Sequence, residues 1–257
     1  MCKKVKDKEK DKKTKKKKPF YRFLKKIAYA FYKKREVIGL ENIENKKVMI
    51  VSNHSQVHGP FSCEFYYTNK KLIWATSEMF DKKAFPAYAM DGFFYDKPKR
   101  TRWFYKMISH MLAPLVQYVF KNADALPVYK DNRMISTFKQ TIEALHEDYN
   151  IILFAENGTP YNEIVCEFHD KFVDVARMYY NKYKEEIYFA PMYVCVELKK
   201  VLVGKPIKYD HTLKIEDQRK LVCDYLKTEI TNLAKSLPQH RVIPFFPCAQ
   251  EECPMSK

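Results

Sequence analysis

The sequence predicts an α/β fold: a single domain with a mostly parallel central sheet flanked by helices. Runs rich in valine, isoleucine and aromatic residues have the length of strands, and they alternate with longer stretches that repeat apolar residues at helical spacing. This alternation is typical of parallel sheets, because two parallel strands need a long crossover between them. The chain of 257 residues, 46% of them hydrophobic, is large enough for one sizeable core.

The elements follow one another in order along the chain. Strands are predicted at 48–52, 72–75, 126–129, 151–155, 188–196 and 201–203, and helices at 60–68, 102–120, 134–147, 167–183 and 215–236. The stretch 102–120 is unusually apolar and contains Pro114; it fits a core helix, which we favour, or the wall of a lipid groove. We assign residues 36–247 to the folded domain and 248–257 to a C-terminal tail.

Most of the net charge of +16 lies in the first 35 residues. They contain 17 Lys or Arg and three acidic residues, which gives +14, whereas the remainder has 30 basic and 28 acidic residues, which gives +2. Residues 1–18 are Lys-rich and cannot bury a core, so we expect a disordered tail. Because the folded body is nearly neutral, we expect no nucleic-acid partner.

Residues 19–35 have the pattern of a basic amphipathic helix. Aromatic and aliphatic residues recur at helical spacing from Phe20 to Tyr32, with lysines and arginines between them. Such a helix fits an anionic membrane surface or the edge of a core; we favour the membrane, because the Lys-rich tail would reinforce it. There is no apolar run long enough to span a bilayer and no secretory signal, so we expect a cytoplasmic protein, peripheral on the inner face of the membrane.

Cofactor and metal sites are not expected. No two of the five glycines lie closer than 20 residues, which excludes a dinucleotide fingerprint and a P-loop. The pairs Cys248 with Cys253 and His54 with His58 each lack a third ligand nearby in the sequence. The seven cysteines are scattered without a paired framework, which is typical of a reducing compartment.

Polar residues follow three of the predicted strands. His54 comes directly after the strand 48–52, Lys130 and Arg133 follow 126–129, and Glu156 ends 151–155 before a tight turn at Asn157-Gly158. Each has an ordinary structural explanation as a turn residue or a solvated first turn of a helix. If the strands are parallel neighbours, these side chains meet at one sheet edge, where a histidine base beside cations could deprotonate a hydroxyl on an anionic molecule.

The order of these segments resembles the glycerophospholipid acyltransferase superfamily, which includes lysophosphatidic acid acyltransferases. That family has an N-H-x4-D motif, a strand ending in an arginine, an F-P-E-G-T motif and a V-P strand. The corresponding residues here are Asn53-His54, the strand ending at Lys130, Phe154-Ala-Glu-Asn-Gly-Thr159 and Ala190-Pro191. The resemblance covers roughly residues 36–210, and four blocks in this order are a fairly specific signal.

The resemblance implies an O-acyltransferase of phospholipid synthesis or remodelling. His54 would be the general base that deprotonates a hydroxyl of a glycerol-phosphate or lysolipid acceptor. The acyl donor would be acyl-CoA or acyl carrier protein as co-substrate, without a further cofactor. Asn53, Lys130 and Glu156 would position the acceptor, and Gly158 and Thr159 would shape the turn; Arg133 is added from its proximity alone.

The chain departs from the family pattern at its most informative position. Gly59 stands where the family has the aspartate that orients the histidine, Asn157 interrupts the third block, and Ala155 replaces its proline. An alternative is therefore a catalytically weakened lipid-binding protein on the same fold. If only the carboxylate is missing, Gly59→Asp should raise activity, whereas a lower rate would point to a substitute carboxylate elsewhere, for which Glu64, Glu78 and Asp91 are candidates.

Overall fold

The computed structural model describes residues 19–95, 97–161, 164–245, 255 and 256, with the backbone alone at 158–161. The predicted tail 1–18 and most of the predicted C-terminal tail lie outside these residues. The contacts divide the chain at Tyr32, Thr76 and Ala125 into two compact units. One unit is helical and the other holds the sheet, and each is described by itself.

The sheet has eight strands and is mostly parallel. Its order is β1 (Glu36–Ile38), β9 (Lys200–Val203), β8 (Tyr188–Cys195), β2 (Val48–Ser52), β5 (Asn150–Leu153), β3 (Lys71–Thr76) and β4 (Ala125–Val128), with β10 (Ile207–Lys208) paired to β8. β2 is parallel to both of its neighbours, β5 and β8, while β9 and β10 are antiparallel to β8. The predicted α/β fold with a mostly parallel central sheet flanked by helices is therefore confirmed.

The alternation of side chains along the strands divides the core into two layers. In β2, Met49 and Val51 belong to one hydrophobic cluster and Val48 and Ile50 to the other, and all four are fully buried. Successive side chains of a strand point to opposite faces, so a strand covered on both faces is continuously apolar. This explains why β2 could be recognised from its sequence.

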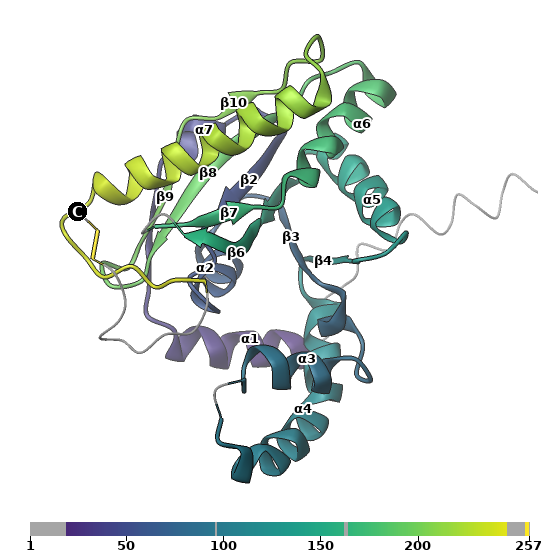
Figure 1. Ribbon diagram of the computed structural model, residues 1–257, viewed down its shortest axis with the longest axis vertical. Helices are drawn as coiled ribbons and strands as arrows, with labels where there is room; N and C mark the ends of the chain where they lie inside the picture. Colours follow the sequence, from purple (N-terminus) through teal and green to yellow (C-terminus); the bar gives the residue numbers. More distant parts are fainter. Residues whose placement is uncertain (1–18, 96, 162–163, 246–254, 257) are drawn as a thin grey trace, which may run out of the picture. The chain divides into compact units, whose positions relative to one another are not determined.

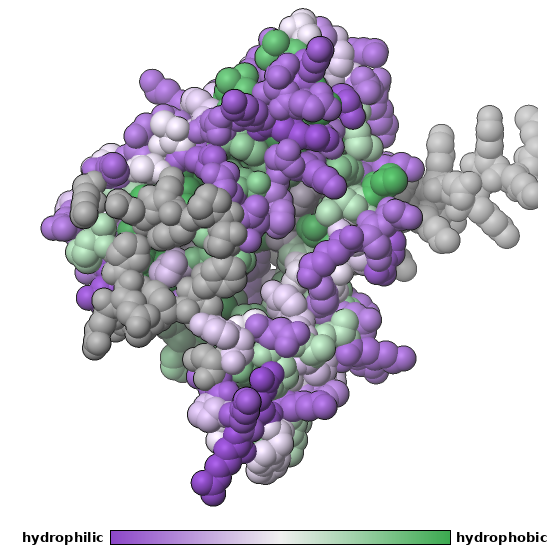
Figure 2. Space-filling view, viewed as in Figure 1, coloured by the Kyte–Doolittle hydropathy of each residue, from purple (hydrophilic) through white to green (hydrophobic). Residues whose placement is uncertain are grey.

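Helices cover both faces of the sheet. The larger cluster contains side chains of α5 (Met134–His146), α6 (Asp174–Tyr183) and α7 (Ile215–Lys235), and α7 runs across the sheet (Figure 1). The opposite cluster contains Cys63 of α2 (His58–Tyr66). The outward side of α7 is covered mainly by hydrophilic residues (Figure 2), as its amphipathic sequence requires.

The helical unit contains α1 (Pro19–Phe31), α3 (Phe85–Gly92) and α4 (Arg102–Asn122). Phe85 and Ala89 of α3 form a small buried cluster with Ala113 of α4. In α4 only Ser109 and Ala113 are buried, so the prediction that this apolar stretch is a core helix is wrong. No helix among the described residues is long and apolar enough to cross a membrane.

The chain after β5 differs from the prediction. In place of a tight turn at Asn157-Gly158, Glu156–Tyr161 form strand β6, which pairs antiparallel with β7 (Cys166–Phe168). The predicted helix 167–183 consequently starts later, at Asp174, after a 3-10 turn at Asp170–Val173. The predicted N-terminal helix ends at Phe31, and β1 begins at Glu36.

Candidate active site

The end of β2 leads into a turn that is anchored to the neighbouring strand β8. The side-chain oxygen of Asn53 accepts the backbone N–H of Val194 at 2.7 Å, and its amide group donates to the Val194 carbonyl at 3.2 Å and to Ser55 Oγ at 2.7 Å. These bonds occupy the Asn53 side chain, which is buried. Asn53 therefore fixes the position of the turn that carries His54.

The His54 ring is oriented by the backbone. Its Nδ1 contacts the carbonyl oxygen of Gln56, two residues further on. A carbonyl can only accept a hydrogen bond, so the proton lies on Nδ1 and the lone pair of the neutral ring lies on Nε2. Among the described residues no carboxylate forms a hydrogen bond or an ion pair with the ring. The Gln56 carbonyl thus selects the tautomer of the ring.

The carbonyl reaches the ring because the turn is left-handed at two successive residues. Ser55 has φ 44° and Gln56 has φ 55°, a region that residues with a side chain rarely adopt. This conformation folds the chain back toward His54 before α2 begins. Two such residues in succession are strained backbone, and strain of this kind concentrates at functional sites.

Aromatic rings surround the imidazole. The ring centroids of Phe154 and Phe245 lie 5.1 Å and 5.0 Å from that of His54. Burial among these groups lowers the pKa of His54, and the hydrogen bond to Gln56 opposes the shift without cancelling it. His54 is consequently neutral at physiological pH and available as a proton acceptor.

Glu156 holds the same turn from the other side. Its Oε2 accepts the backbone N–H of His54 at 2.6 Å, and its Oε1 accepts the N–H of Cys166 at 3.1 Å. The carboxyl group is buried, and this desolvation raises its pKa to about 7. The structure thus brings Glu156 and His54 together, but both carboxyl oxygens bind backbone amides.

Gly59 is required by the space around it. A Cβ built at this position would lie 2.5 Å from the His54 carbonyl oxygen, 2.9 Å from that of Asn53 and 2.8 Å from the Phe154 ring. Two of these neighbours are backbone atoms, which cannot move without displacing the turn. The expectation that Gly59→Asp raises activity is therefore wrong: an aspartate here would disrupt the histidine turn before it could orient the ring.

The cations predicted for the site lie further away along the sheet. Lys130 and Arg133 follow β4, which is separated from β2 by β5 and β3. Three strand spacings amount to about 14 Å. Arg133 pairs with Asp131 at 2.7 Å and lies over the Tyr129 ring, 4.3 Å from its centroid. Sheet order alone therefore does not bring these two residues to His54.

The remaining predicted residues lie close in the chain to this turn or to Glu156. Gly158 and Thr159 belong to β6, two and three residues after Glu156, and only their backbone is described. His58 begins α2 and is half-buried. Among the described residues, Glu186, Asp210 and His211 have potential metal-ligand atoms within 4.8 Å of one another. Glu186 already pairs with both His211 and Lys208 at 2.6 Å.

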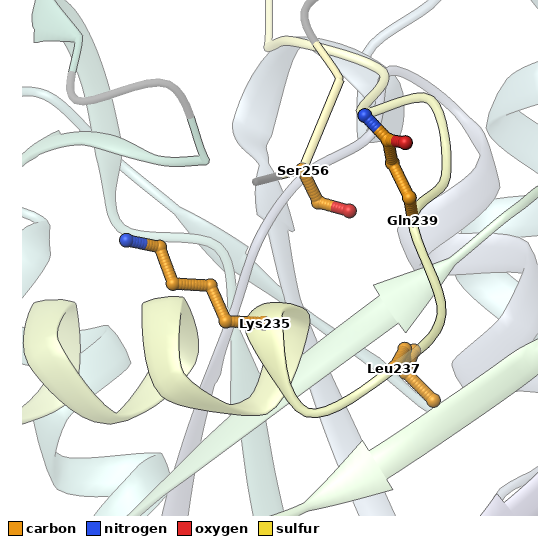
Figure 3. A pocket seen from close by; sticks show the side chains of 4 residues that line it. All are labelled: Lys235, Leu237, Gln239 and Ser256. Carbon is orange, nitrogen blue, oxygen red and sulfur yellow. The ribbon is translucent and has the colours of Figure 1, made fainter.

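A separate cavity lies beyond the C-terminal end of α7. Its volume is about 360 Å³, and its lining consists of Lys235, Leu237, Gln239 and Ser256 (Figure 3). Beside it the buried His240 contacts Tyr193 and Ser256 at 2.8 Å and 3.0 Å. Ser256 is therefore buried, although it belongs to the segment 248–257 that the sequence analysis assigns to a C-terminal tail. None of the predicted site residues lines this cavity.

Comparison with known proteins gives similarities to solved structures alone. No family model and no curated protein matches the sequence. Among solved structures, the chain is similar to the crystal structure of the 1-acyl-sn-glycerophosphate (LPA) acyltransferase PlsC from Thermotoga maritima, with a TM-score of 0.47 and 16% identity. The similarity covers 83% of this chain and 78% of that one. At this level it assigns no activity, which must be argued from the residues.

Proposed function

We propose that the protein is a membrane-associated O-acyltransferase that transfers a fatty acyl group from acyl-CoA or acyl carrier protein to a hydroxyl of a glycerol-phosphate or lysolipid acceptor. The observation that carries the proposal is the contact between His54 Nδ1 and the Gln56 carbonyl. It leaves Nε2 as the proton acceptor at the end of a central parallel strand, where α/β folds hold their chemistry. The motif order of the sequence supports the same reaction.

The reaction needs one base and one thioester. Nε2 of His54 removes the hydroxyl proton while the hydroxyl oxygen bonds to the acyl carbon. The carbon–sulfur bond then breaks, and the departing thiolate takes the proton back from the imidazolium. Because the Gln56 carbonyl accepts from Nδ1–H in both protonation states, it holds the ring in place during the transfer.

A backbone carbonyl in place of the motif aspartate changes how strongly the protonated His54 ring is stabilised. An aspartate would stabilise the imidazolium by its negative charge, whereas a carbonyl offers only a dipole. Together with burial, this makes His54 a weaker base than the same residue beside a carboxylate. The missing carboxylate beside His54 also favours a second candidate function. This candidate is a lipid-binding protein that retains the fold and the turn and transfers acyl groups slowly or not at all.

The test is acyl transfer by the purified full chain. Palmitoyl-CoA and palmitoyl–acyl carrier protein are the donors, and glycerol 3-phosphate, lysophosphatidic acid and lysophosphatidylcholine are the acceptors. We expect His54→Ala to lower the rate at least 100-fold, the lower limit for loss of a positioned base. His169→Ala, which removes an exposed histidine of the same unit, should retain it.

Two outcomes would contradict the proposal. Turnover that is unchanged in His54→Ala would remove His54 from the role of base. If the wild-type chain retains a labelled lysolipid and shows no transfer with either donor, the lipid-binding alternative would be supported.

A further inference from the structure

Helix α4 presents an unusual surface for a helix packed within a compact unit. Its buried residues are the small Ser109 and Ala113. Six of its large apolar side chains are exposed, with exposed fractions from 40% to 73%: Trp103, Phe104, Met107, Met111, Leu112 and Leu115. The helix therefore packs through one face, which includes Ala113, Val116 and Phe120, and exposes six large apolar side chains on the other.

These side chains form one continuous face. At 3.6 residues per turn, the positions from Trp103 to Leu115 occupy about half of the helix circumference, opposite Ser109 and Ala113. Over this stretch the face is about 18 Å long. Single exposed apolar residues are normal on protein surfaces, but a contiguous group of this kind marks an interaction site.

The charge around the face indicates the partner. Between Lys97 and Asn122 the sequence has six basic residues and no acidic one. Lys99, Arg100, Arg102 and Lys106 are exposed at the N-terminal end of α4. Positive charge at that end opposes the helix dipole, so these residues do not stabilise the helix itself. An external anionic surface is the partner that they would complement.

We propose that the apolar face of α4 inserts into the interfacial region of an anionic bilayer, with Trp103 and Phe104 at headgroup level and the basic end of the helix against lipid phosphates. An interfacial position fits the sequence better than a spanning one, because no described helix is long and apolar enough to cross a bilayer. This contact is distinct from that expected of α1 and the Lys-rich tail. It extends the proposed membrane association and does not depend on acyl transfer.

Vesicle flotation of full-chain variants tests the contact. Met107→Glu combined with Met111→Glu places two carboxylates in the centre of the face, and we expect roughly tenfold weaker binding to phosphatidylserine-containing vesicles. Leu221→Glu introduces the same type of charge at a singly exposed leucine of α7, 46% exposed, and should bind as the wild type does. Equal binding of all three proteins would overturn the proposal.

Tryptophan quenching gives a measurement without a charge-introducing variant. The two tryptophans are Trp103 and Trp74, and Trp74 is half-buried with its N–H donated to Thr141 at 3.0 Å. Lipids brominated in the acyl chain should quench Trp103, so Trp103→Phe should abolish the lipid-dependent quenching. Quenching that persists in this variant, or none in the wild type, would place the face outside the bilayer.

Two further measurements separate the alternatives. If sedimentation shows an oligomer that Met107→Glu with Met111→Glu dissociates, α4 contacts a second copy and the membrane proposal fails. Transfer between a water-soluble short-chain donor and acceptor should be unchanged by the double substitution. Failure of the proposed enzymatic function would instead appear as absent transfer in every variant, including the wild type.

Discussion

At the scale of residues, a backbone carbonyl takes the place of the carboxylate that the sequence resemblance leads us to expect beside His54. The aspartate position is occupied by Gly59, where a Cβ would lie 2.5 Å from a backbone carbonyl oxygen. The acceptor for His54 Nδ1 is the carbonyl of Gln56, which the left-handed turn brings to the ring. The absence of the carboxylate and the shape of the turn are therefore two aspects of one local structure.

This exchange predicts that the backbone, and not the side chain, of Gln56 matters. Replacing Val57 by its 2-hydroxy acid analogue converts the Gln56 amide into an ester, whose carbonyl is a weaker acceptor, and keeps every side chain. We expect a rate loss of about fivefold, from about 1 kcal/mol of a hydrogen bond to the charged imidazolium. Gln56→Ala retains the carbonyl and should keep the wild-type rate.

The ring tautomer provides an independent measurement of the same arrangement. Nitrogen-15 shifts of the neutral His54 ring should report the proton on Nδ1 in the wild type and in Gln56→Ala. An Nε2–H ring in the wild-type protein would contradict the assigned orientation, and a large rate loss in Gln56→Ala would shift the role to the side chain.

At the scale of elements, the hairpin β6–β7 secures the turn that carries His54. Glu156 begins β6 and bridges the backbone of β7, at Cys166, to that of the turn, at His54. A buried carboxyl group that accepts two backbone N–H bonds is a strong cross-link, since leaving those donors unpaired would be costly. This makes Glu156 a positioning residue for the turn.

The raised pKa of Glu156 predicts a pH dependence of stability. The pKa of a glutamate near 4.5 when unfolded rises to about 7 in the folded chain, so folding favours the protonated form. The contribution is fully present below pH 4.5 and is lost as the pH rises through 7; the difference amounts to about 3 kcal/mol. Glu156→Gln, which does not titrate, should lack this loss.

Denaturant unfolding of the wild type and of Glu156→Gln between pH 4.5 and 8.5 measures this loss of stability. The difference in unfolding free energy between the two proteins isolates Glu156 from His54, whose lowered pKa acts in the opposite direction. Exposed Glu147, replaced in the same way, is the control. A difference between wild type and Glu156→Gln that does not change with pH would refute the assignment.

The sequence predicted the elements that local patterns determine. Strands β2 and β8 are continuously apolar, because both of their faces are buried, and both were recognised within one residue of their bounds. The hairpin β6–β7 was missed, because its pairing depends on contacts outside either segment. Likewise, glutamine at position 56 does not predict a positive φ, so the sequence could not identify the acceptor of the His54 N–H. His54 itself could be identified from its place after β2.

At the scale of the whole molecule, most of the net charge and the candidate site lie in different parts of the chain. Residues 1–35 carry +14 and the remainder only +2, while His54, Gln56 and Glu156 all belong to the nearly neutral part. We therefore expect removal of basic residues from the segment 1–35 to change membrane attachment without altering the candidate site. The attraction of this segment to anionic lipid should be electrostatic and strongly screened by salt.

This separation predicts the effect of removing residues 1–18, which contain 11 lysines and three acidic residues. Each basic residue near an anionic surface contributes about 1 kcal/mol. The truncated chain should bind phosphatidylserine vesicles more weakly at low salt and show a smaller salt dependence, because residues 19–35 still carry six basic residues, while transfer between soluble substrates stays unchanged. Flotation over a salt series measures how steeply binding falls with salt, with neutral vesicles as the reference.

A Lys-rich tail could also bind polyanions, so added RNA serves as a competitor. If RNA removes the full chain from vesicles at physiological salt, the tail prefers nucleic acid and the membrane assignment of the tail is wrong.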